Sequence, residues 1–180
     1  ILAPIFMLFL ITHTLLIVWG VAFHVPDMPS TFVALNHDFQ RDVKSFGLLY
    51  LASTFLHAYS LGGGTYTGIE AVSNGLAVMR EPRVQTAKRT MMYMAVSLAF
   101  TASGLILCYL MWQVAPEEGK TLNAVLFERI LGDGTFGAWA VVITLLAEGL
   151  LLVVAAQAGF MDGPRVLANM AIDSWVPRSF

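Results

Sequence analysis

A cluster of glycine and hydroxyl residues interrupts a long apolar stretch of the sequence at residues 62–70. The segment reads Gly-Gly-Gly-Thr-Tyr-Thr-Gly-Ile-Glu, and a glycine costs a helix interior about 1 kcal/mol relative to alanine. A helix broken here would expose N–H groups, which suit an anion, and C=O groups, which suit a cation. Close helix packing would explain the glycines but not the hydroxyls. We therefore predict a substrate-binding site formed by Gly63, Gly64, Thr65, Tyr66, Thr67 and Gly68.

Three titratable residues are candidates for coupling or proton transfer. Glu70 follows Thr67 by three residues, so the two share a face of a resumed helix. Glu148 lies in another apolar stretch, and His57 precedes the glycine run. An acidic residue at such depth usually faces a bundle interior or a water-filled cavity. His13 could also relay protons, since histidine is the residue type that changes charge near neutral pH. For His13 and Glu148 a hydrogen bond between helices is the alternative role.

Composition indicates that these residues belong to a membrane protein. Of the 180 residues, 57% are hydrophobic and 12% are charged, whereas soluble domains have about 25% charged residues. Only Glu70 and Glu148 of the charged residues lie inside the long apolar segments. We therefore expect an all-α, multi-pass integral membrane protein of the plasma membrane. The single Cys108 excludes an internal disulfide and argues against redox chemistry.

Four apolar segments are long enough to span the hydrocarbon core, which takes about 20 residues. The second is too long for one straight helix, and we expect it to break near 62–67. The predicted spans are 1–23, 46–79, 91–115 and 136–161, and the predicted loops are 24–45, 80–90, 116–135 and 162–180.

The charges of the loops predict on which side of the membrane each loop lies. Loop 80–90 has four basic residues and one acidic residue, whereas 24–45 and 116–135 are net acidic. The positive-inside rule therefore makes 80–90 and 162–180 cytoplasmic and the other two loops extracellular. Within 116–135, the spacing of the apolar residues predicts a short amphipathic helix. This helix would lie along the membrane interface or form a lid over an outer vestibule.

The two ends of the sequence suggest a piece of a longer protein. There is no initiator methionine, basic n-region or small-residue cleavage site, so Ile1 does not begin a signal peptide. The first apolar segment starts at once, and 180 residues are too few to enclose a solute pathway. We expect further helices of the same chain on both sides.

Two blocks of the sequence resemble the amino acid–polyamine–organocation (APC) superfamily. Thr67–Asn74, followed by Arg80–Pro82 and Thr86–Thr90, is similar to the broken sixth helix of that superfamily and its next cytoplasmic loop. Gly163–Asp173, followed by Trp175–Phe180, is similar to the loop after the eighth helix. The blocks come in the expected order, with one helix pair between them.

The resemblance implies a LeuT-type fold of two inverted five-helix repeats, of which residues 1–180 would be helices five to eight of one transmembrane transporter domain. Solute would lie between the broken first and sixth helices, and the first helix would precede Ile1. The motif is near both the amino acid permease and the potassium–proton symporter branches. Many amino acid permeases carry an aromatic residue where this chain has Gly68, and this departure moves weight toward a cation.

The sequence therefore predicts a secondary active transporter, an APC-type permease for proton-coupled uptake of amino acids. A potassium or other cation–proton symporter of the same superfamily is the alternative, and a channel is a remote one. Metal-protease, serine-hydrolase and Cys/His nucleophile motifs are absent from the sequence, so we expect no enzyme.

The same prediction sets the expected ligands and partners. We expect no cofactor other than a co-transported proton or monovalent cation, and no metal site. The expected partners are the lipid bilayer, a small solute such as an amino acid or a monovalent cation, and the remaining helices of the chain. A homodimer is left open, and no nucleic acid is expected.

Overall fold

The computed structural model describes residues 2–63, 72, 75–76, 79–132 and 134–177. All regular structure in these ranges is helical, which confirms the all-α membrane fold class predicted from hydropathy. The helices are α1 (Leu2–His24), η1 (Val25–Asp27), α2 (Met28–Phe46), α3 (Leu48–Leu61), α5 (Arg83–Met111), α6 (Leu122–Leu131) and α7 (Thr135–Ile172).

Three helical stretches in the described part of the chain are long and apolar enough to cross a membrane. They are Ala3–Phe46, whose apolar part is α1, Arg83–Met111 and Thr135–Gln157. The apolar α3 has 14 residues, fewer than the roughly 20 that a span needs. It ends at Leu61, where we expected the first half of the broken span to end. The expected break beyond Gly63 lies outside the described residues.

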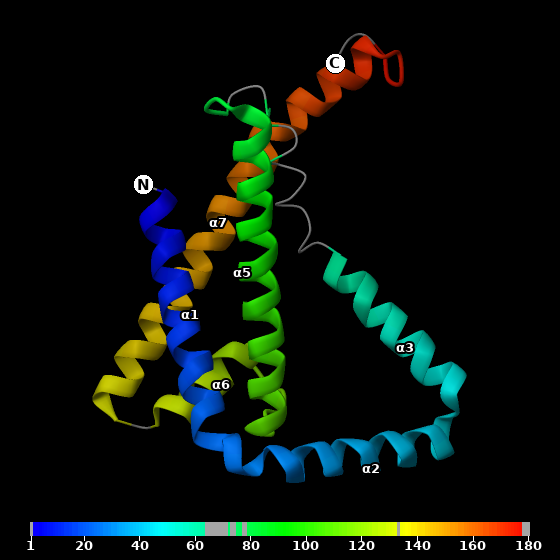
Figure 1. Cartoon of the computed structure of the whole chain (residues 1–180), viewed down its shortest axis with the longest axis vertical. Helices are drawn as coiled ribbons and strands as arrows, with labels where there is room; N and C mark the ends of the chain where they lie inside the picture. The colour runs from blue at the N-terminus through cyan, green and yellow to red at the C-terminus, as the bar shows by residue number, and fades with distance from the viewer. Residues whose placement is uncertain (1, 64–71, 73–74, 77–78, 133, 178–180) are drawn as a thin grey trace.

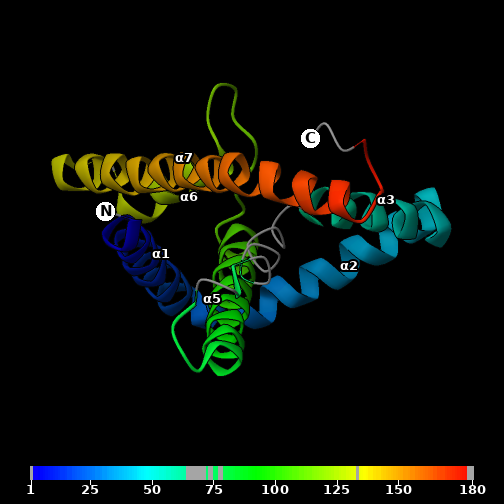
Figure 2. The same cartoon turned by 90° about the horizontal axis from the view of Figure 1, so that it is seen from above.

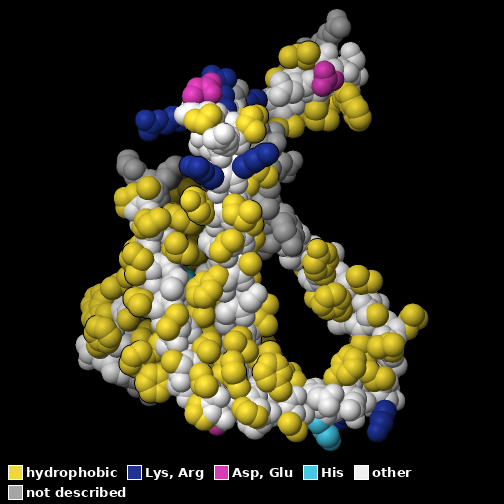
Figure 3. Space-filling model, in the orientation of Figure 1, with side chains coloured by type: hydrophobic (Ala, Val, Ile, Leu, Met, Phe, Trp, Pro, Cys, Tyr) yellow, Lys and Arg dark blue, Asp and Glu magenta, His cyan; other side chains and the backbone are white. Residues whose placement is uncertain are grey.

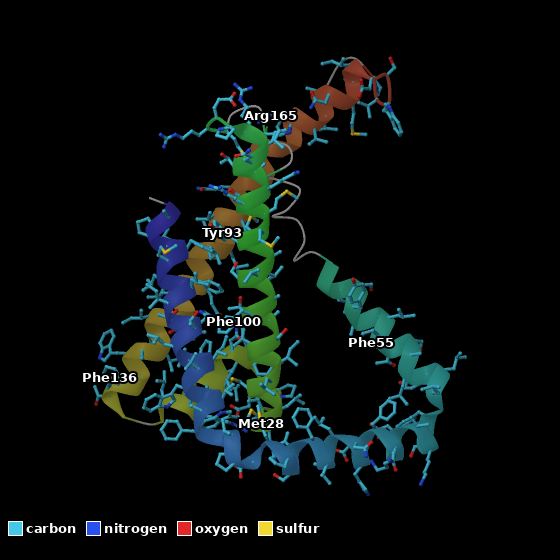
Figure 4. All side chains as sticks on the ribbon, in the orientation of Figure 1. Met28, Phe55, Tyr93, Phe100, Phe136 and Arg165 are labelled. Atoms are coloured by element: carbon cyan, nitrogen blue, oxygen red, sulfur yellow. The ribbon has the colours of Figure 1, made fainter. Side chains whose placement is uncertain are left out.

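Helices α1, α5, α6 and α7 form a bundle, and α2 and α3 extend away from it (Figures 1 and 2). The short α6 contacts all three long helices of the bundle. By contrast α3 contacts α2, and its side chains other than Leu51 are exposed; Phe55, labelled in Figure 4, lies on this helix away from the bundle. The core of the bundle consists of Leu16, Ile17, Cys108, Leu126, Phe127, Ile130 and Val141.

Residues 24–45, expected to be a loop, are instead mostly helical. Helix α2 starts with Pro29 in its first turn and ends at Gly47, whose φ of 83° is accessible to glycine. Its apolar residues, such as Phe32, Leu35 and Phe39, recur at intervals of three and four, which makes one face of a helix. Charged residues such as Arg41 and Lys44 lie on the opposite face of this amphipathic helix, and their presence led us to predict a loop.

The two expected cytoplasmic loops are also shorter than predicted. Helix α5 begins at Arg83 instead of residue 91, because Lys and Arg are good helix formers. Helix α7 continues through Pro164 to Ile172, and proline is tolerated in membrane helices. Basic side chains gather at the end of the molecule where α5 begins, and apolar side chains cover much of the visible surface below (Figure 3).

Two glycines allow α1 and α5 to approach closely. A Cβ on Gly104 would lie 2.6 Å from Cγ2 of Ile17, and a Cβ on Gly20 would lie 3.2 Å from Sγ of Cys108. The indole N–H of Trp112 also donates to the carbonyl of Gly20 at 3.1 Å. This contact helps to fix the position of α1, which carries the buried His13.

Candidate functional site

The described bundle contains a buried acid–base pair formed by His13 and Glu148. Nε2 of His13 lies 2.8 Å from Oε1 of Glu148, and the two residues are 135 positions apart in the sequence. The His13 side chain is 0% exposed, and that of Glu148 is 18% exposed. His13 is near the middle of α1, and Glu148 is near the middle of the apolar part of α7. The pair therefore lies deep within the membrane-spanning part of the bundle.

Helix α6 and helix α5 extend this pair into a chain of hydrogen bonds. The side-chain amide of Asn123 donates to Oε1 of Glu148 at 2.6 Å. The hydroxyl of Tyr109 donates to Oδ1 of Asn123. Four side chains from four helices thus form one polar cluster, which we call the His13–Glu148 cluster. Ionisable residues inside membrane spans are candidates for a functional role.

The environment of the imidazole is apolar and aromatic. The ring of Phe9 lies 4.0 Å from the ring of His13 between centroids, and Phe127 meets it edge-on at 5.4 Å. Nδ1 of His13 lies 2.9 Å from the carbonyl of Phe9, one helical turn earlier. Because a carbonyl only accepts, Nδ1 carries a hydrogen. This hydrogen bond fixes the orientation of the ring and directs Nε2 toward Glu148.

Local features of the sequence position α6 so that Asn123 reaches the cluster. Thr121 caps the first turn, and its hydroxyl accepts from the backbone N–H of Ala124 at 3.2 Å. The apolar face of α6 is packed against the long helices, and Phe127 is 0% exposed. At the other end, the Arg129 guanidinium donates to the carbonyl of Trp112 at 3.0 Å, which ties α6 to the end of α5. The predicted amphipathic helix is thus confirmed, and it is inserted into the bundle.

The structure brings together only part of the predicted site. Glu148 and His13, considered separately in the sequence, contact each other. His57 lies exposed on α3 and is not part of the His13–Glu148 cluster. Gly63 is exposed just beyond the end of α3. The remaining predicted positions lie outside the described residues: Gly64, Thr65, Tyr66, Thr67, Gly68 and Glu70.

Sequence reasoning missed Asn123 and Tyr109, although a signal for Asn123 exists. On a helix, Asn123 shares a face with Phe127 and Ile130, so it is a polar residue on the buried face of an amphipathic helix. Thr144, one turn before Glu148, is buried but donates to the carbonyl of Ala140 in its own helix. It therefore does not extend the cluster.

A second polar feature lies at the end of α5. A cavity of about 930 Å³ opens between α2 and the end of α5, with Asp27, Asp38 and Arg129 among its lining residues. His24 also lines it, and its buried Nδ1 has no hydrogen-bond partner among the described residues. Within the same part of the chain, no three His, Cys, Asp or Glu residues are grouped to hold a metal ion.

Comparison with known proteins gives one informative match. No family model matches the chain, and no solved structure matches it. The chain is 31% identical over 125 residues to the potassium transporter KimA of Bacillus subtilis (strain 168). The chain is similar to a transporter. The match covers 69% of this chain and 20% of KimA, so the chain spans about a fifth of the length of this relative.

The comparison and the structure agree on the class of protein. Three apolar spans and a likeness to a transporter make this chain an integral membrane protein. KimA is named as a potassium transporter, and its name describes no enzymatic activity.

Proposed function

We propose that the chain is part of a secondary active transporter that moves potassium or a similar monovalent cation together with a proton. The likeness to KimA carries the cation part of this proposal. The partly buried His13–Glu148 pair supports the proton part, because paired ionisable residues inside membrane spans form the proton relays of pumps and transporters. The chain would be one section of a larger transport domain, completed by helices before and after it.

We further propose that the cation binds at the glycine and hydroxyl segment of residues 63–68. Carbonyl oxygens freed by a break in the helix suit a cation, and the hydroxyl of Thr67 supplies another oxygen. Glu70 would share a face with Thr67 and balance the charge of the cation. The LeuT-type arrangement expected from the resemblance would place the other wall of the site on helices upstream of Ile1.

Two other functions rank behind this one. Uptake of amino acids remains an alternative within the same superfamily, but Gly68 replaces the aromatic residue found in many amino acid permeases. A channel would require a pore that is continuous across the membrane in its open state. Alternating exposure of one site fits a broken helix better, since half-helices can open to either side in turn.

The proposal is tested with the full-length protein reconstituted in proteoliposomes. Radioactive rubidium, as a substitute for potassium, should accumulate in a saturable manner when a proton gradient is imposed. Radiolabelled amino acids should not accumulate. Rubidium flux that rises linearly with concentration would contradict a transporter, and saturable uptake of an amino acid alone would contradict cation transport.

Two variants test the binding segment in the same assay. Thr67→Ala and Glu70→Gln should each lower rubidium uptake, because each removes an oxygen ligand or a balancing charge. Thr54→Ala is the matched control, since the Thr54 hydroxyl donates to the carbonyl of Tyr50 on the exposed α3. Normal uptake by both site variants would defeat the assignment of the segment.

A further inference from the structure

We propose that His13 and Glu148 together form the proton-binding site of this protein, with α6 closing the site through Asn123. This inference rests on the proposed cation–proton transport and names the group that carries the proton. Among the residues that the sequence suggests for coupling or proton transfer, the proposal assigns the proton to this pair. His57 is exposed on α3, and it contacts neither member of the pair.

The hydrogen-bond partners of the two side chains determine how many hydrogens lie between them. Nδ1 of His13 is protonated, because its neighbour is the carbonyl of Phe9 at 2.9 Å. Nε2 and Oε1 of Glu148 lie 2.8 Å apart, so one hydrogen lies between them. It belongs either to an imidazolium beside a carboxylate or to a carboxylic acid beside a neutral imidazole. In both forms the pair holds one dissociable proton and has no net charge.

Loss of this proton would cost free energy, because it would leave a charge in the bundle. Without it, the lone pair of Nε2 would face the carboxylate of Glu148, and one negative charge would remain deep in an apolar bundle. An unpaired buried charge is expensive. The pair therefore keeps its proton in the closed arrangement and releases it when water reaches Glu148. This is the behaviour that a proton-binding site in a transport cycle requires.

Helix α6 closes the pair from one side. Asn123 donates to the same oxygen of Glu148 that faces His13, and Tyr109 fixes the amide from the other side. Asn123 lies in the first turn of α6, within the segment 116–135 that we predict to be extracellular. A displacement of α6 would therefore remove a hydrogen bond from Glu148 and open the pair on that side.

Other charged groups near the pair do not compete for its proton. From α5, Tyr109 is bonded to Asn123, and the Cys108 thiol faces the carbonyl of Ile17. The charged residues of α6 point elsewhere: Glu128 accepts from Lys120, and Arg129 donates to the end of α5. Among the described residues of the bundle, the pair therefore has no other ionised side chain within hydrogen-bond distance.

The test measures proton uptake and rubidium uptake together, with a pH-sensitive dye sealed inside proteoliposomes that contain the full-length protein. Glu148→Gln should abolish rubidium accumulation driven by the proton gradient, while downhill exchange of rubidium continues. His13→Gln, which keeps an amide near the position of the ring, should do the same. Glu117→Gln is the control, because the Glu117 carboxylate is 46% exposed in the outer loop and should keep normal coupling. Proton-driven accumulation by both pair variants would overturn the proposal.

An infrared measurement separates this proposal from the proposed function. The pH-dependent difference spectrum of the purified protein should contain bands of the pair, from the Glu148 carboxyl or carboxylate group and from the His13 imidazole. These bands should be lost in Glu148→Gln and in His13→Gln and should persist in Glu117→Gln. This readout does not require transport, so it remains decisive if rubidium is not moved. A difference spectrum that is unchanged in both pair variants would show that the pair does not exchange a proton, and the proposal would fail.

Discussion

The side-chain amide of Asn123 donates to Oε1 of Glu148 at 2.6 Å, so the first turn of α6 reaches a carboxylate in the middle of a membrane helix. This contact joins α6 to α7 and makes the short helix part of the polar core. Its apolar neighbours on α6, Val125 and Leu126, are almost fully buried at 1% and 0% exposure. Apolar packing and the Asn123 hydrogen bond therefore act together to hold α6 in the bundle.

Asn123→Ala should destabilise the full-length protein by about 1 kcal/mol, a typical value for hydrogen bonds between membrane helices. The loss comes from two bonds, since Glu148 loses a donor and Tyr109 loses its acceptor. The free energy of unfolding in mixed detergent micelles, followed by circular dichroism, measures the change. Asn169→Ala, at an exposed position late in α7, is the control. Equal stability of the two variants would show that the Asn123 bonds contribute nothing.

His13→Leu should cost about 3 kcal/mol, because it leaves Glu148 buried without its partner. His13→Leu combined with Glu148→Leu should cost less than the sum of the two single changes, since the double variant leaves no buried charge without a partner and loses only the acceptor of the Asn123 amide. The double-mutant cycle measured by detergent unfolding gives the coupling between the two side chains.

The exposed Lys120–Glu128 ion pair is the control for this double-mutant cycle. Lys120 donates to Glu128 at 2.6 Å, but the side chains are 42% and 44% exposed. The equivalent cycle to alanine at this pair should give a coupling below about 1 kcal/mol. If the buried pair shows no larger coupling than the exposed one, the buried contact does not stabilise the bundle.

Gly104→Ala should destabilise the bundle by about 1–3 kcal/mol, as overpacking does. The added Cβ would lie 2.6 Å from Cγ2 of Ile17, whereas a Cβ on Gly149 of α7 would meet no atom within 4 Å. Gly149→Ala is therefore the control and should be neutral or stabilising. Gly104→Ala should cost less in an Ile17→Ala background than in the native sequence, because Ile17→Ala removes the clashing methyl group. Thermal unfolding in detergent measures all three, and an equal effect of the two glycine changes would contradict close packing of α1 on α5.

The membrane character and the main helices could be predicted from the sequence because hydropathy and charge are local properties. Spans α1, α5 and α7 and the amphipathic α6 follow from runs of apolar residues and from their spacing. Helix α2 was not predicted, because the many charged residues of this segment were interpreted as the sign of a loop. The helical spacing of Phe32, Leu35 and Phe39 was the better signal, since an amphipathic helix carries charge on one face.

The His13–Glu148 cluster could be predicted only in part. Each residue is recognisable as an unusual polar group in an apolar helix, but the contact joins positions 135 residues apart. Periodicity within one helix does not determine which partner its polar face meets. Asn123 was detectable as a polar residue on the apolar face of α6, whereas Tyr109 resembles many tyrosines in membrane helices. The pairing thus depends on how four helices pack.

The orientation of the chain leads to the last prediction, which concerns the two ends of α5. This helix has 29 residues and is about 43 Å long at about 1.5 Å per residue, so it exceeds a hydrocarbon core of about 30 Å. The basic cluster at its start should therefore lie in the cytoplasm, and Glu117 beyond its end should lie outside. In full-length protein with Cys108→Ser, a membrane-impermeant maleimide should label Glu117→Cys in intact cells. Lys88→Cys should react only after permeabilisation, and the opposite pattern would invert the proposed topology.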